Sequence, residues 1–261
     1  MDEREKPIGF FDSGVGGLSV LLHAVKELKN ENFIYYGDDK NAPYGEKSEE
    51  EIKELTIQCG QFLYGKGVKA IVMACNTATS IAVQRMREIF QIPVVSIEPA
   101  VKPACEANAQ GKILVMATPA TILQKRYNNL VDRLGCRDRV VNLPCDGLAQ
   151  LLESGDFAQP AIEDYLRRKF APIEGETIAG IVIGCTHYSF ITGKIQAVAQ
   201  ELFQGDCAIY DGMYGMVRQL GVVLRENGLD SPGPGGEISL YSSGGDRMIR
   251  IFEKVIRQNR G

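Results

Sequence analysis

Two cysteines, Cys75 and Cys185, occur in matching sequence contexts, each immediately after a run of apolar residues. The two segments are IVMACNT (71–77) and IVIGCTH (181–187). Asn or Thr follows each cysteine, and both residue types begin helices well. A thiol at a helix N-terminus is expected to have a lowered pKa, because free N–H groups stabilise its thiolate. The repeat therefore predicts two reactive thiols, each able to act as an acid, a base or a nucleophile.

The remaining cysteines lack this context of a strand followed by a helix cap. The chain has seven cysteines and two histidines, and no two cysteines have the CxxC spacing. An odd number of thiols without that spacing does not fit a disulfide framework, and two histidines do not suffice for a closed zinc site. We therefore expect no bound metal. The other cysteines are interpreted as packing residues: Cys59, Cys105, Cys136, Cys145 and Cys207.

Polar loops follow the first two predicted strands. The first loop, DSGVGG (12–17), has glycines that permit a tight turn and a close backbone approach to a ligand, and N–H groups that suit an anion. Because its last two glycines are adjacent and no Lys follows, it matches neither GxGxxG nor a Walker loop, and a carboxylate ligand suits it. Asp12 is expected either to cap the next helix or to orient or deprotonate a nearby thiol. Tyr44 and Gly45 lie in the second loop.

Further polar residues follow later strands. Thr118 and Thr121 come after the fifth predicted strand, and their pattern favours helix capping. Glu153 ends a predicted helix and by itself is a solvated carboxylate. Beside His187, the same carboxylate would fix the tautomer of the imidazole.

Short β-branched runs alternate with helical patterns along the chain. The runs predict strands at 8–11, 33–36, 70–74, 94–97, 113–117, 140–143, 178–183 and 208–210. Apolar residues at a 3.6-residue period predict helices at 18–28, 49–63, 80–90, 120–134, 162–170, 194–202 and 215–225. This alternation predicts an α/β fold with parallel sheets and helices on both faces. Sites in such sheets lie beyond the carboxyl ends of the strands, where both reactive cysteines stand.

The chain also repeats itself on a larger scale. Besides the two cysteine segments, the first strand at 8–11 is echoed by 113–117 at a similar offset. Two matched offsets indicate two α/β halves of like topology. A stretch rich in Pro and Gly, 231–236, predicts a turn or linker before a last strand at 238–241 and a last helix at 247–258.

Composition limits the class of protein. The chain has 261 residues with 44% hydrophobic and 24% charged residues, which is ordinary for a globular protein. A net charge of −4 argues against a nucleic-acid partner. No apolar run reaches the ~18–20 residues that span a bilayer, and the mixed-charge start is not a signal peptide. We therefore expect a cytoplasmic protein with reduced thiols and no membrane association.

Several segments together resemble one enzyme family. They are FFDSGVGGLSV (10–20), DDKNAPYGEKS (38–48), IVMACNTATS (71–80), IPVVSIEP (92–99) and IVIGCTHYSFI (181–191). In this order they resemble glutamate racemases, a branch of the aspartate/glutamate racemase family, from about residue 8 to residue 211. The resemblance implies two pseudo-symmetric α/β domains that enclose glutamate between them. The expected domains are 1–98 plus 211–261, and 99–210.

The resemblance also implies roles for individual residues. It marks Cys75 and Cys185 as the two catalytic acid/bases, assisted by Asp12 on one side and by Glu153 with His187 on the other. It marks a larger set as the residues that hold the substrate: Asp12, Ser13, Tyr44, Gly45, Asn76, Thr77, Thr118, Thr121, Thr186 and His187. Members of the family commonly form homodimers and supply D-glutamate for peptidoglycan, so both are expected of this chain.

Two thiols suit racemisation, because one removes the α-proton and the other returns a proton to the opposite face. No lysine-based cofactor signature is evident, so we expect no cofactor, with hydrogen-bond donors stabilising the developing charge instead. Three alternatives remain open. They are an aspartate or related amino-acid racemase, a thiol amidase that uses Cys185 with His187, and a non-catalytic amino-acid-binding protein.

Overall fold

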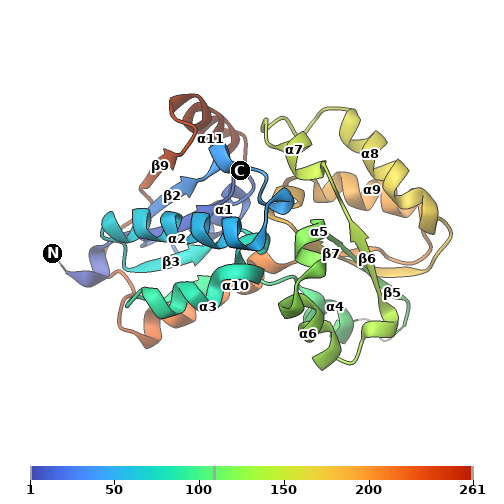
Figure 1. Cartoon of the computed structure of the whole chain (residues 1–261), viewed down its shortest axis with the longest axis horizontal. Helices are drawn as coiled ribbons and strands as arrows, with labels where there is room; N and C mark the ends of the chain where they lie inside the picture. Colours follow the sequence, from blue (N-terminus) through green and yellow to red (C-terminus); the bar gives the residue numbers. More distant parts are fainter. Residues whose placement is uncertain (1, 108–109, 260–261) are drawn as a thin grey trace.

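The computed structural model describes residues 2–107 and 110–259, and it confirms the predicted α/β class. The chain forms two lobes, each built around a parallel sheet (Figure 1). The strands of the first sheet are β1 (Ile8–Asp12), β2 (Phe33–Gly37), β3 (Ala70–Met73), β4 (Val94–Ser96) and β9 (Ile238–Ser242). Those of the second are β5 (Lys112–Ala117), β6 (Val140–Pro144), β7 (Ile178–Gly184) and β8 (Ala208–Asp211).

The two sheets share one topology. The first has the order β4-β3-β1-β2-β9 and the second, read from its far edge, has the order β8-β7-β5-β6. Strands β1 to β4 therefore correspond one by one to β5 to β8, as the internal sequence repeat indicates. Strand β9 extends the first sheet by pairing in parallel with β2. Equivalent strands, β3 and β7, lead directly into the two cysteine segments.

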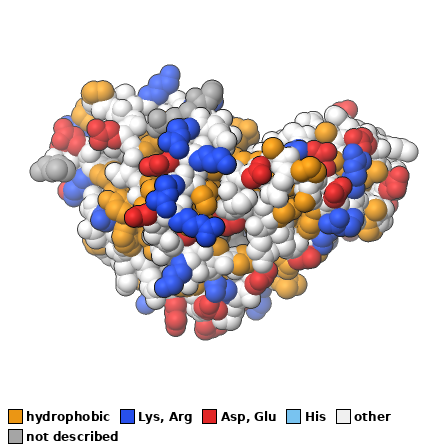
Figure 2. Space-filling model, turned by 90° about the horizontal axis from the view of Figure 1, so that it is seen from above, with side chains coloured by type: hydrophobic (Ala, Val, Ile, Leu, Met, Phe, Trp, Pro, Cys, Tyr) orange, Lys and Arg blue, Asp and Glu red, His pale blue; other side chains and the backbone are white. Residues whose placement is uncertain are grey.

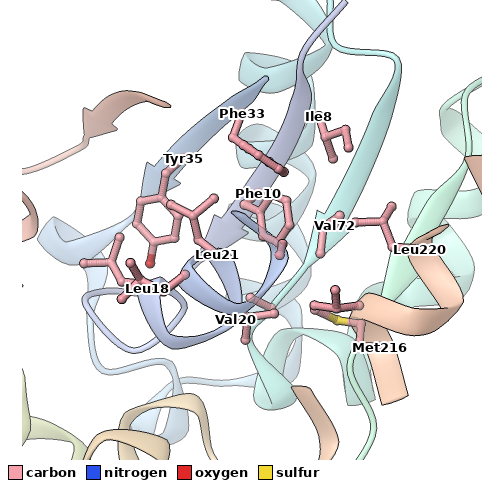
Figure 3. Close-up of a cluster of buried hydrophobic side chains, with 14 of the residues drawn as sticks. Ile8, Phe10, Leu18, Val20, Leu21, Phe33, Tyr35, Val72, Met216 and Leu220 are labelled. Atoms are coloured by element: carbon pink, nitrogen blue, oxygen red, sulfur yellow. The ribbon is translucent and has the colours of Figure 1, made fainter. Parts of the chain in front are cut away.

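Helices cover both faces of the first sheet. They are α1 (Leu18–Glu27), α10 (Gly212–Glu226) and α11 (Asp246–Asn259) on one face, and α2 (Glu49–Gly65) and α3 (Asn76–Ile89) on the other. Side chains alternate along each strand, so Phe10 and Tyr35 pack against α1, α10 and α11 (Figure 3), whereas Phe11 and Ile34 pack against α2 and α3. Because both faces are covered, every residue of β1 is buried.

The second sheet is covered in the same way. Its helices are α7 (Leu148–Leu152), α8 (Ala161–Phe170) and α9 (Thr192–Leu202) on one face, and α4 (Val101–Ala107) and α6 (Lys125–Arg133) on the other. The short helix α5 (Pro119–Leu123) follows β5. Short 3-10 helices complete the fold: η1 (Glu3–Glu5), η2 (Asp39–Asn41), η3 (Tyr44–Glu46), η4 (Arg137–Arg139), η5 (Ala171–Ile173) and η6 (Thr186–Ile191).

The chain passes between the lobes twice, between β4 and α4 and between β8 and α10. These two connections touch each other at Gly212, where a Cβ atom would lie 2.2 Å from the carbonyl oxygen of Glu98. Only glycine permits this approach of two backbones. Helix α10 follows the second sheet in sequence, yet Met216 and Leu220 pack in the core of the first lobe (Figure 3).

The structure corrects the predicted helices in three places. Helix α3 begins at Asn76 rather than at residue 80, because Cys75 is its N-cap. The single helix predicted at 120–134 is two helices, since Gln124 adopts an extended conformation between α5 and α6. Helix α4 was not predicted, and of α7 only its end at Glu153 was, because both helices are too short to show a clear period. In the described part of the chain, no helix combines the length and apolar character needed to cross a bilayer.

Candidate active site

A cavity of about 190 Å³ lies between the two lobes, at the carboxyl ends of both sheets. Cys75 and Cys185 both line it, one from each lobe. Most of the other residues that the sequence singles out line it as well: Ser13, Tyr44, Gly45, Asn76, Thr77, Thr118, Glu153, Thr186 and His187. Asp12 and Thr121 lie behind this lining and contact residues that belong to it. The fold therefore brings the predicted site residues together.

Cys75 is the N-cap of α3 and is 5% exposed. Its Sγ accepts a hydrogen bond from Ala78 N at 3.5 Å and lies 3.7 Å from Ser13 Oγ. The sequence predicts a lowered pKa for this thiol, and that prediction is wrong. Burial and the Asp12 carboxylate raise the pKa of the Cys75 thiol to about 12, although Ala78 N–H and Ser13 lower it. Desolvation outweighs the helix terminus because the sulfur is buried beside a carboxylate.

Cys185 stands beside a buried His–Glu pair. Its Sγ lies 3.7 Å from Nδ1 of His187, whose Nε2 lies 2.6 Å from Glu153 Oε2. Burial lowers the pKa of His187, but the Glu153 carboxylate and the Cys185 sulfur raise it, and the pKa lies well above its ordinary value. The imidazole is therefore protonated and can donate toward both neighbours. Glu153 follows the last residue of α7, at the helix end predicted for it.

The glycines of the loop at 12–17 contact the second lobe, whereas Ser13 of the same loop lines the cavity. A Cβ atom on Gly14 would lie 2.2 Å from Glu153 Oε1, and one on Gly16 would lie 2.5 Å from His187 Nδ1. The amide of Val15 donates to Glu153 Oε1 at 2.9 Å. The glycines predicted to permit a close approach to a ligand thus permit a close approach of Glu153 and His187 to the backbone.

Asp12 is fully buried behind the cavity wall. Its carboxylate accepts hydrogen bonds from Gly14 N at 3.0 Å and from Thr186 Oγ1 at 3.1 Å, so it joins the two lobes. Burial raises the pKa of Asp12 to about 6, partly offset by the charge of His187 and by these hydrogen bonds. Asp12 acts on Cys75 through its charge, which raises the pKa of that thiol.

Replacing Asp12 by asparagine is expected to stabilise the protein at neutral pH. The pKa rises from 3.8 to about 6 on folding, so the wild-type free energy of unfolding falls as the pH rises through this interval and then stays level. The loss amounts to about 3 kcal/mol at neutral pH. Asp12→Asn removes this loss of stability, because asparagine carries no ionisable group. The Thr186 hydroxyl can rotate and still form a hydrogen bond with the asparagine side chain. Urea unfolding should show a gain at about pH 7.5 and almost none at about pH 4. An equal effect at both pH values would contradict this explanation.

Three threonine hydroxyls join the lobes beside the cavity. Thr77 Oγ1 of α3 lies 3.0 Å from Thr118 Oγ1 and 3.3 Å from Thr121 Oγ1. Thr118 also caps α5 by accepting from Thr121 N at 3.2 Å, as its pattern predicts. Gly45 packs against Thr118, since a Cβ atom there would lie 3.2 Å from Thr118 Cβ. These hydroxyls are neutral donors available to a polar ligand.

The side chain of Asn76 indicates which kind of ligand the cavity suits. Its side chain is 5% exposed, lines the cavity, and has no hydrogen-bond partner for either Oδ1 or Nδ2. A buried amide without partners is costly, and a ligand that offers both a donor and an acceptor would remove this cost. An amino acid has both groups.

Some residues of the cavity were not predicted from the sequence. Asp39, Glu46, Asp146 and Gln150 all line it. Asp39 and Glu46 stand in the same segment as Tyr44, and Asp146 and Gln150 follow the carboxyl end of β6, so position relative to the strand ends was the available signal. Cys145, interpreted as a packing residue, is buried in the core of the second lobe and also reaches the cavity.

The charge of the cavity differs from that of the outer surface. The described residues that line it include no lysine or arginine. Basic side chains instead gather on the outside of the first lobe (Figure 2), where α11 exposes Arg247, Arg250, Lys254 and Arg257. A ligand carboxylate in the cavity would therefore be held by neutral donors and by His187. Among the described residues, no group of three or more His, Cys, Asp or Glu could hold a metal ion.

The family model described as Asp/Glu/Hydantoin racemase matches residues 13–220 of this chain. The chain belongs to this racemase family. Curated relatives match this chain over almost its whole length. A glutamate racemase from Clostridium botulinum (strain Langeland) is 46% identical over 250 residues, 95% of this chain and 96% of the relative. One from Clostridium kluyveri is 45% identical over 262 residues, 99% of this chain and 100% of the relative.

Solved structures of racemases show the same fold. Glutamate racemase from Francisella tularensis, in complex with D-glutamate, has a TM-score of 0.83 at 29% identity, over 97% of this chain and 94% of that chain. The Escherichia coli glutamate racemase, in complex with L-glutamate and the activator UDP-MurNAc-ala, has a TM-score of 0.84 at 25% identity, over 97% and 95%. The resemblance indicated by the sequence segments is therefore confirmed, and this member of the racemase family is an isomerase.

Proposed function

We propose that the protein is a glutamate racemase that interconverts L- and D-glutamate by proton transfer between Cys75, Cys185 and the α-carbon, without a cofactor. One observation carries this proposal. The two thiols come from equivalent strand ends of the two lobes and line one cavity. A substrate held between the lobes would thus present opposite faces of its α-carbon to the two sulfurs.

Two groups are needed because racemisation inverts one carbon centre. A single base tends to return the proton to the face from which it came. A thiolate on one face removes the α-proton, and a thiol on the other face supplies a new proton. The two groups exchange roles in the reverse direction.

The surroundings of the two sulfurs support different resting states. His187 is protonated, and its Nδ1 faces Cys185, so it can donate to a thiolate there. Cys75, whose pKa lies at about 12, holds its proton. We propose that Cys185, beside the imidazole of His187, takes the first proton and that Cys75 supplies the other. The ammonium group of a bound amino acid would lower the pKa of Cys75, which prepares it to act as the base for the other enantiomer.

The charge that develops at the α-carbon and its carboxylate needs donors that are already in place. Asn76 has an unpartnered amide, and Ser13, Thr77 and Thr186 offer hydroxyls. We propose that these groups bind the ammonium and carboxylates of the substrate, together with Tyr44, Gly45, Thr118 and Thr121 of the wall. Removing one donor from such a site typically costs about 2.7–4 kcal/mol in rate.

Glutamate is proposed as the substrate because the relatives are glutamate racemases, and related structures contain D- or L-glutamate. Aspartate is the main alternative within the family. An amidase that uses Cys185 with His187 would leave Cys75 without a role.

The test is the optical rotation of D-glutamate incubated with the purified protein and no added cofactor. Rotation should decay to zero, and the same end point should be reached from L-glutamate. Aspartate and glutamine should change far more slowly. Rotation that stays constant for glutamate, or ammonia released from glutamine, would contradict the proposal.

Further proposals concern the cellular role and assembly. We propose that the enzyme works in the cytoplasm, whose reduced state keeps both thiols free, and supplies D-glutamate for peptidoglycan. We also propose a homodimer, and domains comprising residues 1–98 plus 211–261 and residues 99–210. The assignment of β1 to β4 and β9 to one sheet and of β5 to β8 to the other supports this division. Light scattering of the purified protein tests the dimer.

A further inference from the structure

We propose that Arg126 is a positioning residue for substrate binding, and that it acts on Asn76 through water held in a small pocket between the two side chains. The inference rests on the proposed function, because Asn76 is one of the residues proposed to bind the substrate. The pocket, here termed the side pocket, has a volume of about 50 Å³. Asn76 lines both the side pocket and the cavity, so it forms part of the wall between them.

The side pocket lies where the two lobes and the connection between them meet. Helix α3 of the first lobe supplies Thr79 and Ser80 besides Asn76, and helix α6 of the second lobe supplies Arg126. The connection between β4 and α4 supplies Glu98. Residues far apart in the sequence therefore enclose one polar space behind the proposed substrate site.

Two side chains of the side pocket have buried polar atoms that lack a hydrogen-bond partner. Asn76 is 5% exposed, and neither its Oδ1 nor its Nδ2 pairs with any residue that the structure describes. The Nε of Arg126 is buried and unpaired within the same part of the chain, although Nη2 of this side chain donates to Glu98. Buried polar groups almost always pair with protein or with ordered water. Two unpaired groups on one small pocket therefore indicate a shared partner.

Water is the partner that fits this pocket. A volume of about 50 Å³ has room for about three water molecules, at ~15 Å³ for each. A bound water needs two to four polar contacts, and the side pocket offers the guanidinium of Arg126 on one side and the polar groups of α3 on the other. The ion pair of Arg126 with Glu98 balances the charge of the guanidinium, which favours a neutral occupant over an anion.

The groups around the side pocket determine how its water is oriented. The hydroxyls of Thr79 and Ser80 donate to backbone carbonyl oxygens, at 3.4 Å and 2.8 Å, so toward the pocket they accept and do not donate. The Nε of Arg126, by contrast, is a donor only. Water that accepts from Arg126 therefore points its hydrogens toward α3. Of the two groups of the Asn76 amide, it pairs with the acceptor, Oδ1.

This orientation gives Arg126 an effect on the substrate. With Oδ1 held by water, Nδ2 is the group that Asn76 presents to the cavity, where it donates to a substrate carboxylate. Such a neutral donor is needed because the described residues of the cavity lining include no lysine or arginine. Without the Nε of Arg126 the water loses its orienting donor. The Asn76 amide can then turn over and present Oδ1, which repels a carboxylate.

Arg126→Lys is the variant that isolates this role. Lysine places a methylene group where arginine has Nε, yet it keeps a positive charge beside Glu98. The KM for glutamate should rise about fivefold, because a water-mediated hydrogen bond that orients the binding amide is lost. The kcat should stay within about twofold of wild type, because the carboxylate is charged in both the ground state and the transition state. Glu98→Gln, which removes the charge of the ion pair and leaves Nε in place, is the matched control and should leave KM unchanged.

Changes at Asn76 show whether Arg126 acts through this residue. In an Asn76→Ala background, Arg126→Lys should change the affinity for glutamate by less than about twofold, since the amide that it orients is gone. Calorimetric titration gives the dissociation constant where turnover is too slow to yield a KM. Asn76→Asp keeps an acceptor toward the water but turns a carboxylate toward the substrate, so it should weaken glutamate binding at least about 100-fold. Additive effects of Arg126→Lys and Asn76→Ala, or wild-type affinity in Asn76→Asp, would overturn the proposal.

A high-resolution crystal structure of the ligand-free protein gives a readout that does not depend on activity. Wild type should show ordered water within hydrogen-bond distance of Arg126 Nε and linked to the Asn76 amide, and Arg126→Lys should lose this water or its contact with residue 126. An anion or no ordered occupant in the wild-type pocket, or a wild-type KM in Arg126→Lys, would refute the positioning role. Failure of the proposed function would be recognised separately, as wild-type protein that holds the water but does not racemise glutamate.

Discussion

Replacing Cys75 by alanine is expected to lower the rate of glutamate racemisation by at least about 1,000-fold, because one of the two proton carriers is lost. Cys185→Ala should have an effect of similar size. Each variant should still exchange the α-proton of one enantiomer with solvent, since the remaining thiol serves one face. The two variants should act on opposite enantiomers. Polarimetry measures the first effect, and proton NMR in deuterated water measures the second.

A matched control for these variants is Cys59→Ala. Cys59 is also buried, but its sulfur contacts the Tyr44 hydroxyl at 3.7 Å in the core between α2 and the first sheet, away from the cavity lining. Cys59→Ala should change the midpoint of thermal unfolding more than the rate of racemisation. If Cys75→Ala or Cys185→Ala kept full racemase activity, the two-base mechanism would be wrong.

Replacing Lys69 by methionine is expected to lower the free energy of unfolding by about 3–5 kcal/mol. Lys69 precedes β3, its side chain is fully buried, and it forms an ion pair with Glu31, which is 5% exposed. It also donates to the Arg4 carbonyl oxygen at 2.5 Å. Without the ammonium group, the Glu31 carboxylate would stay buried and unpaired. Urea unfolding followed by circular dichroism measures the loss.

Lys112 provides the comparison for this effect. Its ion pair with Glu176 spans 2.7 Å, but the two side chains are 42% and 43% exposed. Lys112→Met should therefore change the free energy of unfolding by less than about 1 kcal/mol. Replacing Glu31 by leucine in the Lys69→Met background should recover most of the stability, because no charge then remains buried. A wild-type unfolding midpoint for Lys69→Met would contradict this reading of the pair.

Much of the fold follows from short-range patterns in the sequence. The apolar runs at 8–11 and 178–183 are buried on both faces, and such runs are typical of parallel strands. The repeat of the cysteine segments predicted two halves with one topology, which the strand orders confirm. The break at Gln124 was not predictable in this way. There the apolar period continues, and the extended conformation accompanies a contact with Glu49 of the other lobe.

The site residues that directly follow a strand could be predicted from the sequence. The carboxyl-end rule located Cys75 and Cys185. His187 and Glu153 lie far apart in the sequence, so the sequence offered their pairing only as one role for Glu153, and the family resemblance then implied it. The pKa of Cys75 could not be predicted from its helix terminus, because burial beside Asp12 has the larger effect. The spacing of residues in the sequence also does not predict the hydrogen bond that Gln150 donates to Glu46. Contacts between lobes depend on how two separate cores pack together.

The most direct measurement is the early incorporation of deuterium during racemisation in deuterated water. With L-glutamate as the starting material, a two-base enzyme places solvent deuterium at the α-carbon of the D-glutamate formed, while the unreacted L-glutamate keeps its proton. The same should hold from D-glutamate. If both enantiomers carried deuterium equally from the first turnovers, a single base would be returning protons to either face, and the proposed roles of Cys75 and Cys185 would be contradicted.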